Sequence, residues 1–179
     1  DNGEPKLQFM YLRKLAVTSE EIYSVVARKF YNEYSGIQLV NCYGQTECSD
    51  DVLHYVIPHD NMPDRIYLGQ PARNTRILIL NSYGMKQPIG FIGEICVDGD
   101  GVCNGYWKAD ELSKDKFIET PYTNGRKIYR TGDLGLWNEK GYVEFRGRCD
   151  YQIKIRGNRI ELAEIHRKIL EIPEISNAV

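Results

Sequence analysis

A basic segment near the end of the chain holds the densest group of side chains that could take part in chemistry. Residues 147–161 alternate apolar and polar side chains, which predicts a strand, and Gly157 followed by Asn158 suits the tight turn of a β-hairpin. The cations of the segment are Arg148, Lys154, Arg156 and Arg159. Such cations can bind phosphate or carboxylate groups, although a basic hairpin is also typical of a solvated sheet edge.

A second candidate group lies in residues 43–47. Tyr43 offers a ring on which a planar base could stack, and Gly44 lets the backbone approach that base. Thr46 can hydrogen-bond a phosphate oxygen, and Glu47 supplies the oxygen ligands that Mg²⁺ prefers. By itself, a helix N-cap at Thr46 followed by an acidic first turn explains the same residues.

A third candidate is Asp133, which follows Gly132 at the end of a predicted strand. An acidic residue in this position can accept hydrogen bonds from both hydroxyls of a ribose, as in dinucleotide-binding folds. The same residue could equally form an Asx-turn with its own backbone. Each of the three segments is therefore ambiguous when it is taken alone.

The composition is that of an ordinary globular protein and argues against several classes. Of the 179 residues, 42% are hydrophobic and 27% are charged. The net charge of −2 argues against a nucleic-acid partner, and no apolar run approaches the ~20 residues of a membrane span. The five cysteines form no Cys-x-x-Cys pair and the three histidines are scattered, which indicates reduced thiols in a cytoplasmic protein rather than a zinc site.

The two ends of the sequence indicate a segment of a longer protein. Residue 1 is Asp rather than Met, and no charged and apolar leader follows it. The last residues, 176–179, resemble the beginning of an apolar strand. We therefore expect a fragment.

The first 68 residues predict an α/β arrangement. Residues 12–17 and 37–40 are expected to be strands, and the helix between them is expected to begin with a capping box at residues 18–21. The apolar face of that helix is predicted to be Ile22, Val25, Val26 and Phe30. The second strand leads into a polar loop at residues 41–47, and open α/β sheets bind ligands at this end of their strands.

Residues 69–148 predict a small, barrel-like β-sheet. Strands are expected at residues 75–80, 93–97, 127–130, 134–137 and 142–145, with a short helix at residues 110–117. After the basic hairpin, an amphipathic helix is expected at residues 162–170, and its apolar side is predicted to turn inward. That side consists of Ile165, Ile169 and Leu170.

Taken in order, these segments resemble the adenylate-forming enzyme superfamily. The motifs are residues 41–47, 93–106, 129–134 and 147–161, and the resemblance covers nearly the whole chain from Leu12. Within the superfamily, the sequence is most similar to the adenylation domains of non-ribosomal peptide synthetases (NRPS). Each motif is weak alone, but the series is specific.

The resemblance implies an α/β fold with two parts. Residues 1–148 would be the C-terminal part of a large AMP-binding domain. Within it, residues 1–68 would form an α/β layer and residues 69–148 a small distorted β-barrel. Residues 149–179 would begin a small C-terminal lid domain.

The resemblance also implies a nucleotide site. Tyr43 would stack on adenine, Asp133 would bind the ribose hydroxyls, and Arg148 would contact the ribose or a phosphate. The backbone that reads the edge of the base would be that of Asn41, Cys42 and Gly44.

The catalytic residues implied by the resemblance are Thr46, Glu47 and Lys154. Thr46 would hold the α-phosphate, Glu47 would ligate Mg²⁺, and Lys154 would lie on the hairpin that faces the active site. Asp150 matches the hinge about which the lid swings between adenylate-forming and thioester-forming poses. Arg156 and Gly157 would face the phosphopantetheine channel in the second pose.

The amino-acid pocket would be lined by Cys42, Asp50 and Asp51, with Val17 and Ser19 as further candidates. The two carboxylates together would favour a substrate with a cationic side chain, because burying charges of one sign is costly unless they are compensated.

The sequence departs from the family pattern at several positions. Gln45 stands where proline is usual, Thr18 and Ser19 replace a glycine pair, Asn104 replaces a frequent arginine, and Ala163 replaces a glycine. The glycine-rich loop with its lysine, the lysine at the tip of the lid and the aspartate that anchors the substrate amine have no match in these residues. The chain therefore resembles the nucleotide floor and the hinge rather than a whole catalytic set.

The implied reaction is ATP-dependent activation of an amino acid carboxylate as an aminoacyl-adenylate, followed by transfer to a phosphopantetheine thiol. ATP/AMP and Mg²⁺ would bind here, and carrier and condensation domains of the same or a neighbouring chain would be the partners. Two alternatives stay open. One is an acyl-CoA or aryl-acid ligase of the same superfamily, and the other is a non-catalytic remnant or binding module that keeps the fold.

Overall fold

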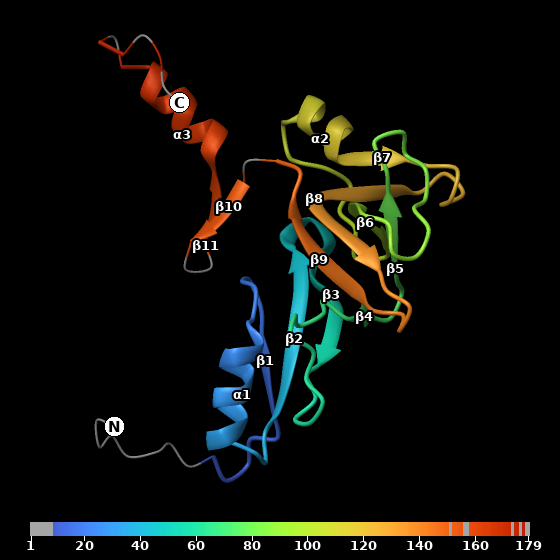
Figure 1. The fold of residues 1–179 in the computed structure, drawn as a ribbon. Coiled ribbons are helices and arrows are strands. Elements are labelled where there is room, and N and C mark those ends of the chain that lie inside the picture. The colour runs from blue at the N-terminus through green and yellow to red at the C-terminus, as the bar shows by residue number, and fades with distance from the viewer. Residues whose placement is uncertain (1–8, 151, 156–157, 173, 176, 178–179) are drawn as a thin grey trace.

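The N-terminal part of the described chain forms a strand–helix–strand unit. The computed structural model describes residues 9–150, 152–155, 158–172, 174–175 and 177. Strand β1 (Lys14–Val17) pairs in parallel with β2 (Gln38–Gln45), and helix α1 (Ser24–Glu33) connects them. β3 (Asp50–Val56) and β4 (Gln70–Pro71) extend this sheet in the order β1-β2-β3-β4 (Figure 1). The predicted unit is confirmed.

β2 continues through most of the segment that was expected to be a loop. It pairs antiparallel with β3 from Val40 opposite Val56 to Gln45 opposite Asp50, with a register shift after Tyr43. A 3₁₀ turn, Thr46–Cys48, follows the strand. The prediction of a loop from Asn41 is therefore wrong up to Gln45, because β3 satisfies the backbone of these polar residues. Side chains along this stretch consequently alternate between the two faces of the sheet.

Helix α1 packs on the sheet through a face that only partly matches the predicted one, since Ile22 and Phe30 pack against the buried cluster as predicted. Ala27 and Tyr31, four residues apart, are buried against residues of β2 and β3, whereas Val25 and Val26 are 70% and 55% exposed. The helix begins at Ser24 after Tyr23, without a side-chain cap. The capping box at residues 18–21 and the inward placement of Val25 and Val26 are therefore wrong.

Strands within residues 75–148 build a second, antiparallel sheet. β5 (Thr75–Leu80), β6 (Gly93–Gly99), β8 (Lys127–Trp137) and β7 (Phe117–Glu119) lie in the order β5-β6-β8-β7, and β9 (Val143–Arg148) also pairs with β8. Helix α2 (Asp110–Lys116) precedes β7 (Figure 1). The strands and the helix lie close to their predicted positions. Residues 127–130 and 134–137, however, belong to one continuous strand.

The two sheets share a hydrophobic core. It includes Tyr43 and Leu53 from the first sheet and Ile95, Tyr129 and Val143 from the second. The C-terminal end of β2 is thereby fixed next to the middle of β8. Residues far apart in the sequence therefore meet where the two sheets join.

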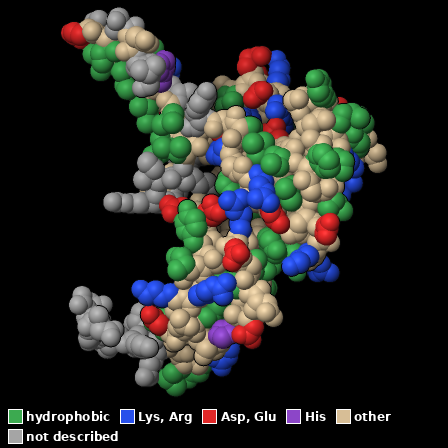
Figure 2. Space-filling model, viewed as in Figure 1, with side chains coloured by type: hydrophobic (Ala, Val, Ile, Leu, Met, Phe, Trp, Pro, Cys, Tyr) green, Lys and Arg blue, Asp and Glu red, His purple; other side chains and the backbone are tan. Residues whose placement is uncertain are grey.

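The C-terminal part contains the predicted hairpin and helix. β10 (Gln152–Ile155) pairs antiparallel with β11 (Asn158–Glu161), and helix α3 (Leu162–Leu170) follows. The turn residues Arg156 and Gly157, like Tyr151, lie outside the described residues. Figure 2 shows hydrophobic side chains along α3, where Ile165 and Leu170 are 46% and 41% exposed. The prediction that these two residues turn inward is wrong.

No helix among the described residues is long and apolar enough to cross a membrane. α1, for example, has 10 residues, about half of the ~20 that a membrane-spanning helix needs.

We expect Tyr31→Phe to weaken the attachment of α1 to the first sheet. The buried Tyr31 hydroxyl donates to the carbonyl oxygen of Ile57 at 2.7 Å and accepts from the amide of Leu39 at 3.0 Å. The variant deprives two backbone groups of this partner, which costs about 1–3 kcal/mol. Amide hydrogen exchange of β2, measured by mass spectrometry on the intact protein, should become at least about 5-fold faster.

The matched control is Tyr23→Phe, since Tyr23 is exposed. This variant should leave the exchange of β2 unchanged. Equal exchange in the Tyr31→Phe variant and the unmodified protein would contradict the prediction.

Candidate functional site

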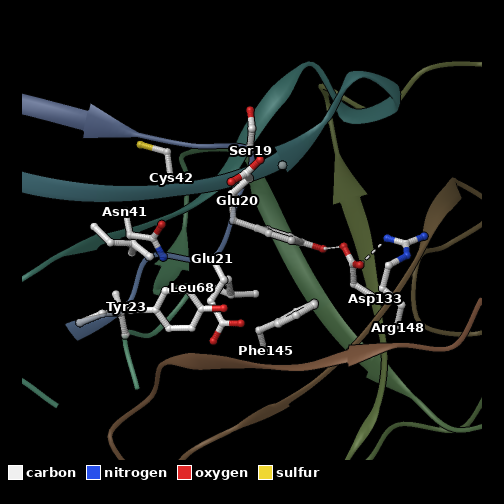
Figure 3. A pocket seen from close by; sticks show the side chains of 14 residues that line it. Ser19, Glu20, Glu21, Tyr23, Asn41, Cys42, Leu68, Asp133, Phe145 and Arg148 are labelled. Atoms are coloured by element: carbon white, nitrogen blue, oxygen red, sulfur yellow. Dashed lines mark hydrogen bonds and ion pairs between the residues drawn. The ribbon is translucent and has the colours of Figure 1, made fainter. Parts of the chain in front are cut away.

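A cavity of about 320 Å³ lies where the two sheets meet (Figure 3). Its walls come from the β1–α1 connection, from β2, from the segment before β4, and from β8 and β9. The lining residues are Ser19, Glu20, Glu21, Ile22, Tyr23, Asn41, Cys42, Tyr43, Gly44, Ile66, Leu68, Asp133, Phe145 and Arg148. A cavity of this size is within the range that binds small molecules, about 300–1,000 Å³.

The cavity brings together most of the residues predicted to bind a nucleotide. Asn41, Cys42, Tyr43 and Gly44 of β2 lie across from Asp133 of β8 and Arg148 of β9. Thr46 and Glu47, by contrast, are not among the described residues that line it. The sequence thus predicted the polar end of this cavity but not its wall at residues 20–23.

Asp133 is the buried charge at the centre of the site. Only 4% of the residue is exposed. Its Oδ2 accepts hydrogen bonds from the Tyr43 hydroxyl at 2.6 Å and from Gln45 Nε2 at 2.8 Å. Its Oδ1 pairs with Arg148 (Figure 3). Because a buried carboxylate is costly unless donors surround it, these contacts compensate its burial and fix its orientation.

The backbone of β8 is shaped to present this carboxylate. Gly132, just before Asp133, has a φ of +74°, and the pairing of β8 with β9 shifts register after Asp133. A Cβ atom at Gly132 would lie 2.4 Å from Oδ2 of Asp150 and 2.7 Å from Nη2 of Arg148. Glycine is therefore favoured here by the positive φ, and a larger residue would also displace the ends of the Asp150 and Arg148 side chains.

Tyr43 acts in the structure as a hydrogen-bond donor to Asp133. Burial, and next the nearby charge of Asp133, raise the pKa of the Tyr43 hydroxyl well above its ordinary value. The hydroxyl therefore keeps its proton and continues to donate to the carboxylate. The ring lies in the cavity wall, where a planar ligand could contact it.

Gln45 is a member of the site whose contact was not predicted from the sequence. Besides donating to Asp133, its Nε2 lies 3.0 Å from the Tyr43 hydroxyl. It reaches Asp133 because Gln45 and Tyr43 are two residues apart on β2 and share one face of the strand. The signal in the sequence was the departure from the usual proline at this position.

Arg148 links the cavity to the predicted hinge. Its Nε and Nη2 donate to the two oxygens of Asp150 at 2.6 and 2.7 Å, and Nη2 also donates to Gln152 Oε1 at 2.9 Å. Lys116 Nζ lies 3.9 Å from Asp150. Burial raises the pKa of the Asp150 carboxyl, but the hydrogen bond and charge of Arg148 outweigh burial and lower it below its ordinary 3.8.

Glu47 lies in a separate polar contact beside the core. The residue is 7% exposed, and its Oε1 accepts a hydrogen bond from the Tyr106 hydroxyl at 2.6 Å. Its carbonyl oxygen accepts from the amide of Cys103 at 2.9 Å. The structure thus connects the motif at residues 41–47 with the motif at residues 93–106. Thr46, its neighbour, is exposed.

The predicted amino-acid pocket residues lie around the edge of β2 and β3. Asp50 is exposed and has a φ of +74°, whereas Asp51 is half-buried and accepts from Thr18 Oγ1 at 3.3 Å. Figure 3 shows the Cys42 thiol directed away from Asp133 and Arg148. Val17 is half-buried and Ser19 lines the cavity.

The hairpin residues are described in part. Lys154 lies on β10 opposite Arg159 of β11. Arg156 and Gly157, predicted to face a thiol channel, lie outside the described residues. Their prediction stays untested.

Comparisons with known proteins agree with this geometry. The model of the family described as "AMP-binding enzyme" matches residues 2–107. The chain is 45% identical over 145 residues to surfactin synthase subunit 3 of Bacillus subtilis (strain 168), which covers 79% of this chain and 11% of that protein. It is 39% identical over 181 residues to gramicidin S synthase 2 of Brevibacillus brevis. That alignment covers 98% of this chain and 4% of that protein.

A solved structure has the same fold. PA1221, described as an NRPS protein containing adenylation and PCP domains, superposes with a TM-score of 0.85 at 29% sequence identity. The match covers 93% of this chain and 34% of PA1221. The α/β fold class predicted from the sequence is confirmed. The chain spans about a third of this structure, and 11% or less of the two synthases above.

We expect Asp150→Asn to lower stability in a pH-dependent manner. Because the pKa of Asp150 is lowered in the fold, its ionised form contributes stability above its ordinary pKa of 3.8, and this is lost as the pH falls through the lowered value. The contribution should not exceed about 1 kcal/mol, since the Asp150 side chain is 32% exposed. The melting temperature of the variant, measured on the intact protein, should therefore lie below that of the parent near neutral pH, and this difference should disappear in acid.

Asp64→Asn, at an exposed position, is the control, and its melting temperature should show no such pH-dependent difference from the parent. A difference in melting temperature between Asp150→Asn and the parent that stays constant well below the ordinary pKa of an aspartate would show that the charge of Asp150 does not cause it.

Proposed function

This chain belongs to the AMP-binding enzyme family, and we propose that it forms the nucleotide floor of an enzyme that activates an amino acid. The proposed reaction joins the carboxylate of the amino acid to the α-phosphorus of ATP and releases pyrophosphate. The acyl group of the resulting aminoacyl-adenylate then passes to the phosphopantetheine thiol of a carrier domain. That PA1221 is described as containing adenylation and PCP domains supports a carrier domain as partner.

The observation that carries this proposal is the buried carboxylate of Asp133 in the cavity wall. Because Oδ2 already accepts from Tyr43 and Gln45 and Oδ1 pairs with Arg148, a ribose diol would bind this carboxylate by taking the place of one or more of these donors. Tyr43 places an aromatic ring in the same cavity, next to the backbone of Asn41, Cys42 and Gly44. The adenine would lie against that ring, and its edge would meet the backbone.

The remaining residues would handle the phosphates and the metal. Glu47 would hold Mg²⁺ through a carboxylate oxygen, and the Tyr106 hydroxyl, 2.6 Å from Oε1, supports the orientation of that carboxylate. Thr46, exposed beside it, would donate to the α-phosphate. When bound, Mg²⁺ supplies neutralisation of the phosphate charge. The residues of this chain would contribute positioning and charge compensation rather than covalent catalysis.

Arg148 would contact the ribose or a phosphate from its place beside Asp133. Its guanidinium now pairs with both Asp133 and Asp150, so it connects the nucleotide cavity with the start of the C-terminal hairpin. We propose residues 1–148 as the large domain, Asp150 as the hinge and residues 149–179 as the beginning of a lid. Lys154 would face the active site in one pose, and Arg156 and Gly157 the thiol channel in the other.

The proposed amino-acid pocket includes Cys42, Asp50 and Asp51. Because Asp51 is half-buried and Asp50 is exposed, Asp51 would contribute more to a preference for a cationic side chain. Condensation domains are the further partners that we propose for such an enzyme.

ATP–pyrophosphate exchange on the intact protein, with a panel of amino acids and simple carboxylic acids, tests the proposal. We expect exchange with one amino acid or a few related ones. Asp133→Asn should reduce the exchange about 100-fold or more, because the amide loses the charge that orients Tyr43, Gln45 and the ribose.

Asp110→Asn, at an exposed position of α2, is the control and should exchange normally. Exchange with fatty or aryl acids alone would favour a carboxylic acid ligase of the same superfamily. Binding of Mg·ATP without exchange for any acid would favour a non-catalytic remnant.

We further expect Gln45→Leu to raise the KM for ATP about 10-fold with little change in kcat. Gln45 donates to the carboxylate of Asp133, and a hydrogen bond to a charged group contributes about 1.5–3 kcal/mol. The low end applies here because Tyr43 and Arg148 also hold Asp133. A loss of binding that is the same in the ground state and the transition state changes KM alone.

The control is Gln87→Leu, which removes a side-chain amide that donates to the carbonyl oxygen of Ile92 at 3.1 Å in another part of the chain. It should leave both constants unchanged. A fall in kcat without a change in KM for the Gln45 variant would show that Gln45 does not act through nucleotide binding.

A further inference from the structure

A thiol, a carboxylate and an imidazole meet on the face of the first sheet that lies opposite α1. A ligand atom from each of Cys42, Asp51 and His54 lies within 4.8 Å of the other two. We propose that these three side chains form a binding site for a single divalent transition-metal ion of the Zn²⁺ type. The proposal does not rest on the proposed function, but it shares Cys42 and Asp51 with the proposed amino-acid pocket, so a bound ion and a substrate side chain would compete for these two residues.

Strand pairing fixes the three ligands relative to one another. Cys42 of β2 lies directly opposite His54 of β3, and Gly44 lies opposite Asp51 in the same ladder. Side chains directly opposite each other in an antiparallel pair have Cβ atoms about 4.5–5.5 Å apart. The register shift after Tyr43 occurs between these two pairs, and the ligand atoms of all three residues converge across it. The site is thus held by backbone hydrogen bonds and does not depend on a flexible loop.

The faces of the sheet are distinct. Leu39 and Tyr55 pack in one buried cluster with residues of α1, and residues of β2 and β3 alternate between faces. Cys42 and His54 are therefore on the opposite face. Figure 3 shows the Cys42 thiol directed away from Asp133 and Arg148. The proposed ion would lie behind β2 as seen from the polar end of the nucleotide cavity.

The ligand types select the metal. A thiolate sulfur with an imidazole nitrogen suits borderline-soft ions such as Zn²⁺ or Co²⁺, whereas Mg²⁺ and Ca²⁺ take oxygen ligands. Three protein ligands leave one position of a tetrahedral ion open. His54 is exposed, so an ion can enter from solvent and complete its coordination with water.

The local charge also favours a cation. Asp51 brings a carboxylate oxygen to within 4.8 Å of the Cys42 sulfur, and its neighbour Asp50 is also acidic. A bound dication would compensate this negative charge. Asp51 also has an outer partner, since Thr18 Oγ1 donates to its Oδ1 at 3.3 Å. Such partners orient a ligating carboxylate.

Metal titration of the intact protein, without nucleotide or amino acid, tests the site. With Zn²⁺, followed by competition with a chromophoric chelator, we expect one ion bound per chain at this site. With Co²⁺, we expect a sulfur-to-metal charge-transfer band, which requires a thiolate ligand. Cys42→Ser and His54→Gln should each weaken Zn²⁺ binding about 100-fold or more. Thr18→Val should weaken it about 10-fold, as loss of an outer partner does.

Matched controls separate this site from general binding by thiols and histidines. Cys103→Ser and His59→Gln replace an exposed cysteine and an exposed histidine and should leave the affinity unchanged. His54→Gln keeps the test valid if Cys42→Ser fails to fold, because the His54 side chain is exposed. Absence of the charge-transfer band would overturn the proposal. Zn²⁺ affinity that is the same in His54→Gln as in the parent would do so as well.

Discussion

The burial of one carboxylate constrains the join between the two sheets. Asp133 is almost entirely removed from water, and a carboxylate in that position is costly unless donors surround it. Tyr43 and Gln45 supply donors from β2, while Arg148 supplies a cation from β9. Because these donors come from both sheets, the hydrogen bonds that satisfy the charge also hold β2 against β8 and β9. The same requirement that stabilises the join therefore shapes the polar end of the cavity.

Arg148 extends this constraint into the C-terminal part of the chain. Its guanidinium is shared between Asp133 and Asp150, and it also donates to Gln152 at the start of β10. Gly132 leaves room for the Asp150 carboxylate and the Arg148 guanidinium to meet, because a Cβ atom at this position would overlap both. A ligand that drew Arg148 toward itself would weaken its bonds to Asp150 and Gln152. This shared cation is a physical route by which occupancy of the cavity would bias the orientation of the hairpin, as a hinge requires.

The sequence predicted the order of the elements better than their faces and lengths. β1, α1 and β2 were evident because apolar strands flank a helical pattern, but polar Asn41 and Gln45 concealed the length of β2. Their backbone is satisfied by β3, a partner that lies beyond the reach of local patterns. Val25 and Val26 are more apolar than Tyr31, yet Tyr31 is buried because its hydroxyl bonds the backbone of Leu39 in β2 and of Ile57 just after β3. Tyr43, Asp133 and Arg148 were each singled out from their own segments, and the family resemblance combined them into one predicted site. The bond from Gln45 to Asp133 was not predicted, because it depends on how β2 meets β8.

The alternation of β2 explains how one strand can serve two kinds of chemistry. Tyr43 and Gln45 share the face that meets Asp133, whereas Cys42 lies on the opposite face beside His54. A shift of one residue in the pairing of β2 would place Cys42 against the Asp133 carboxylate and expose Tyr43. The buried Asp133 carboxylate would then lose the Tyr43 hydroxyl as its donor, and the Cys42 thiol would replace it poorly because a thiol is a weaker donor than a phenol. The demand of Asp133 for strong donors thus selects the register of β2, and that register alone brings Cys42, Asp51 and His54 together on the other side.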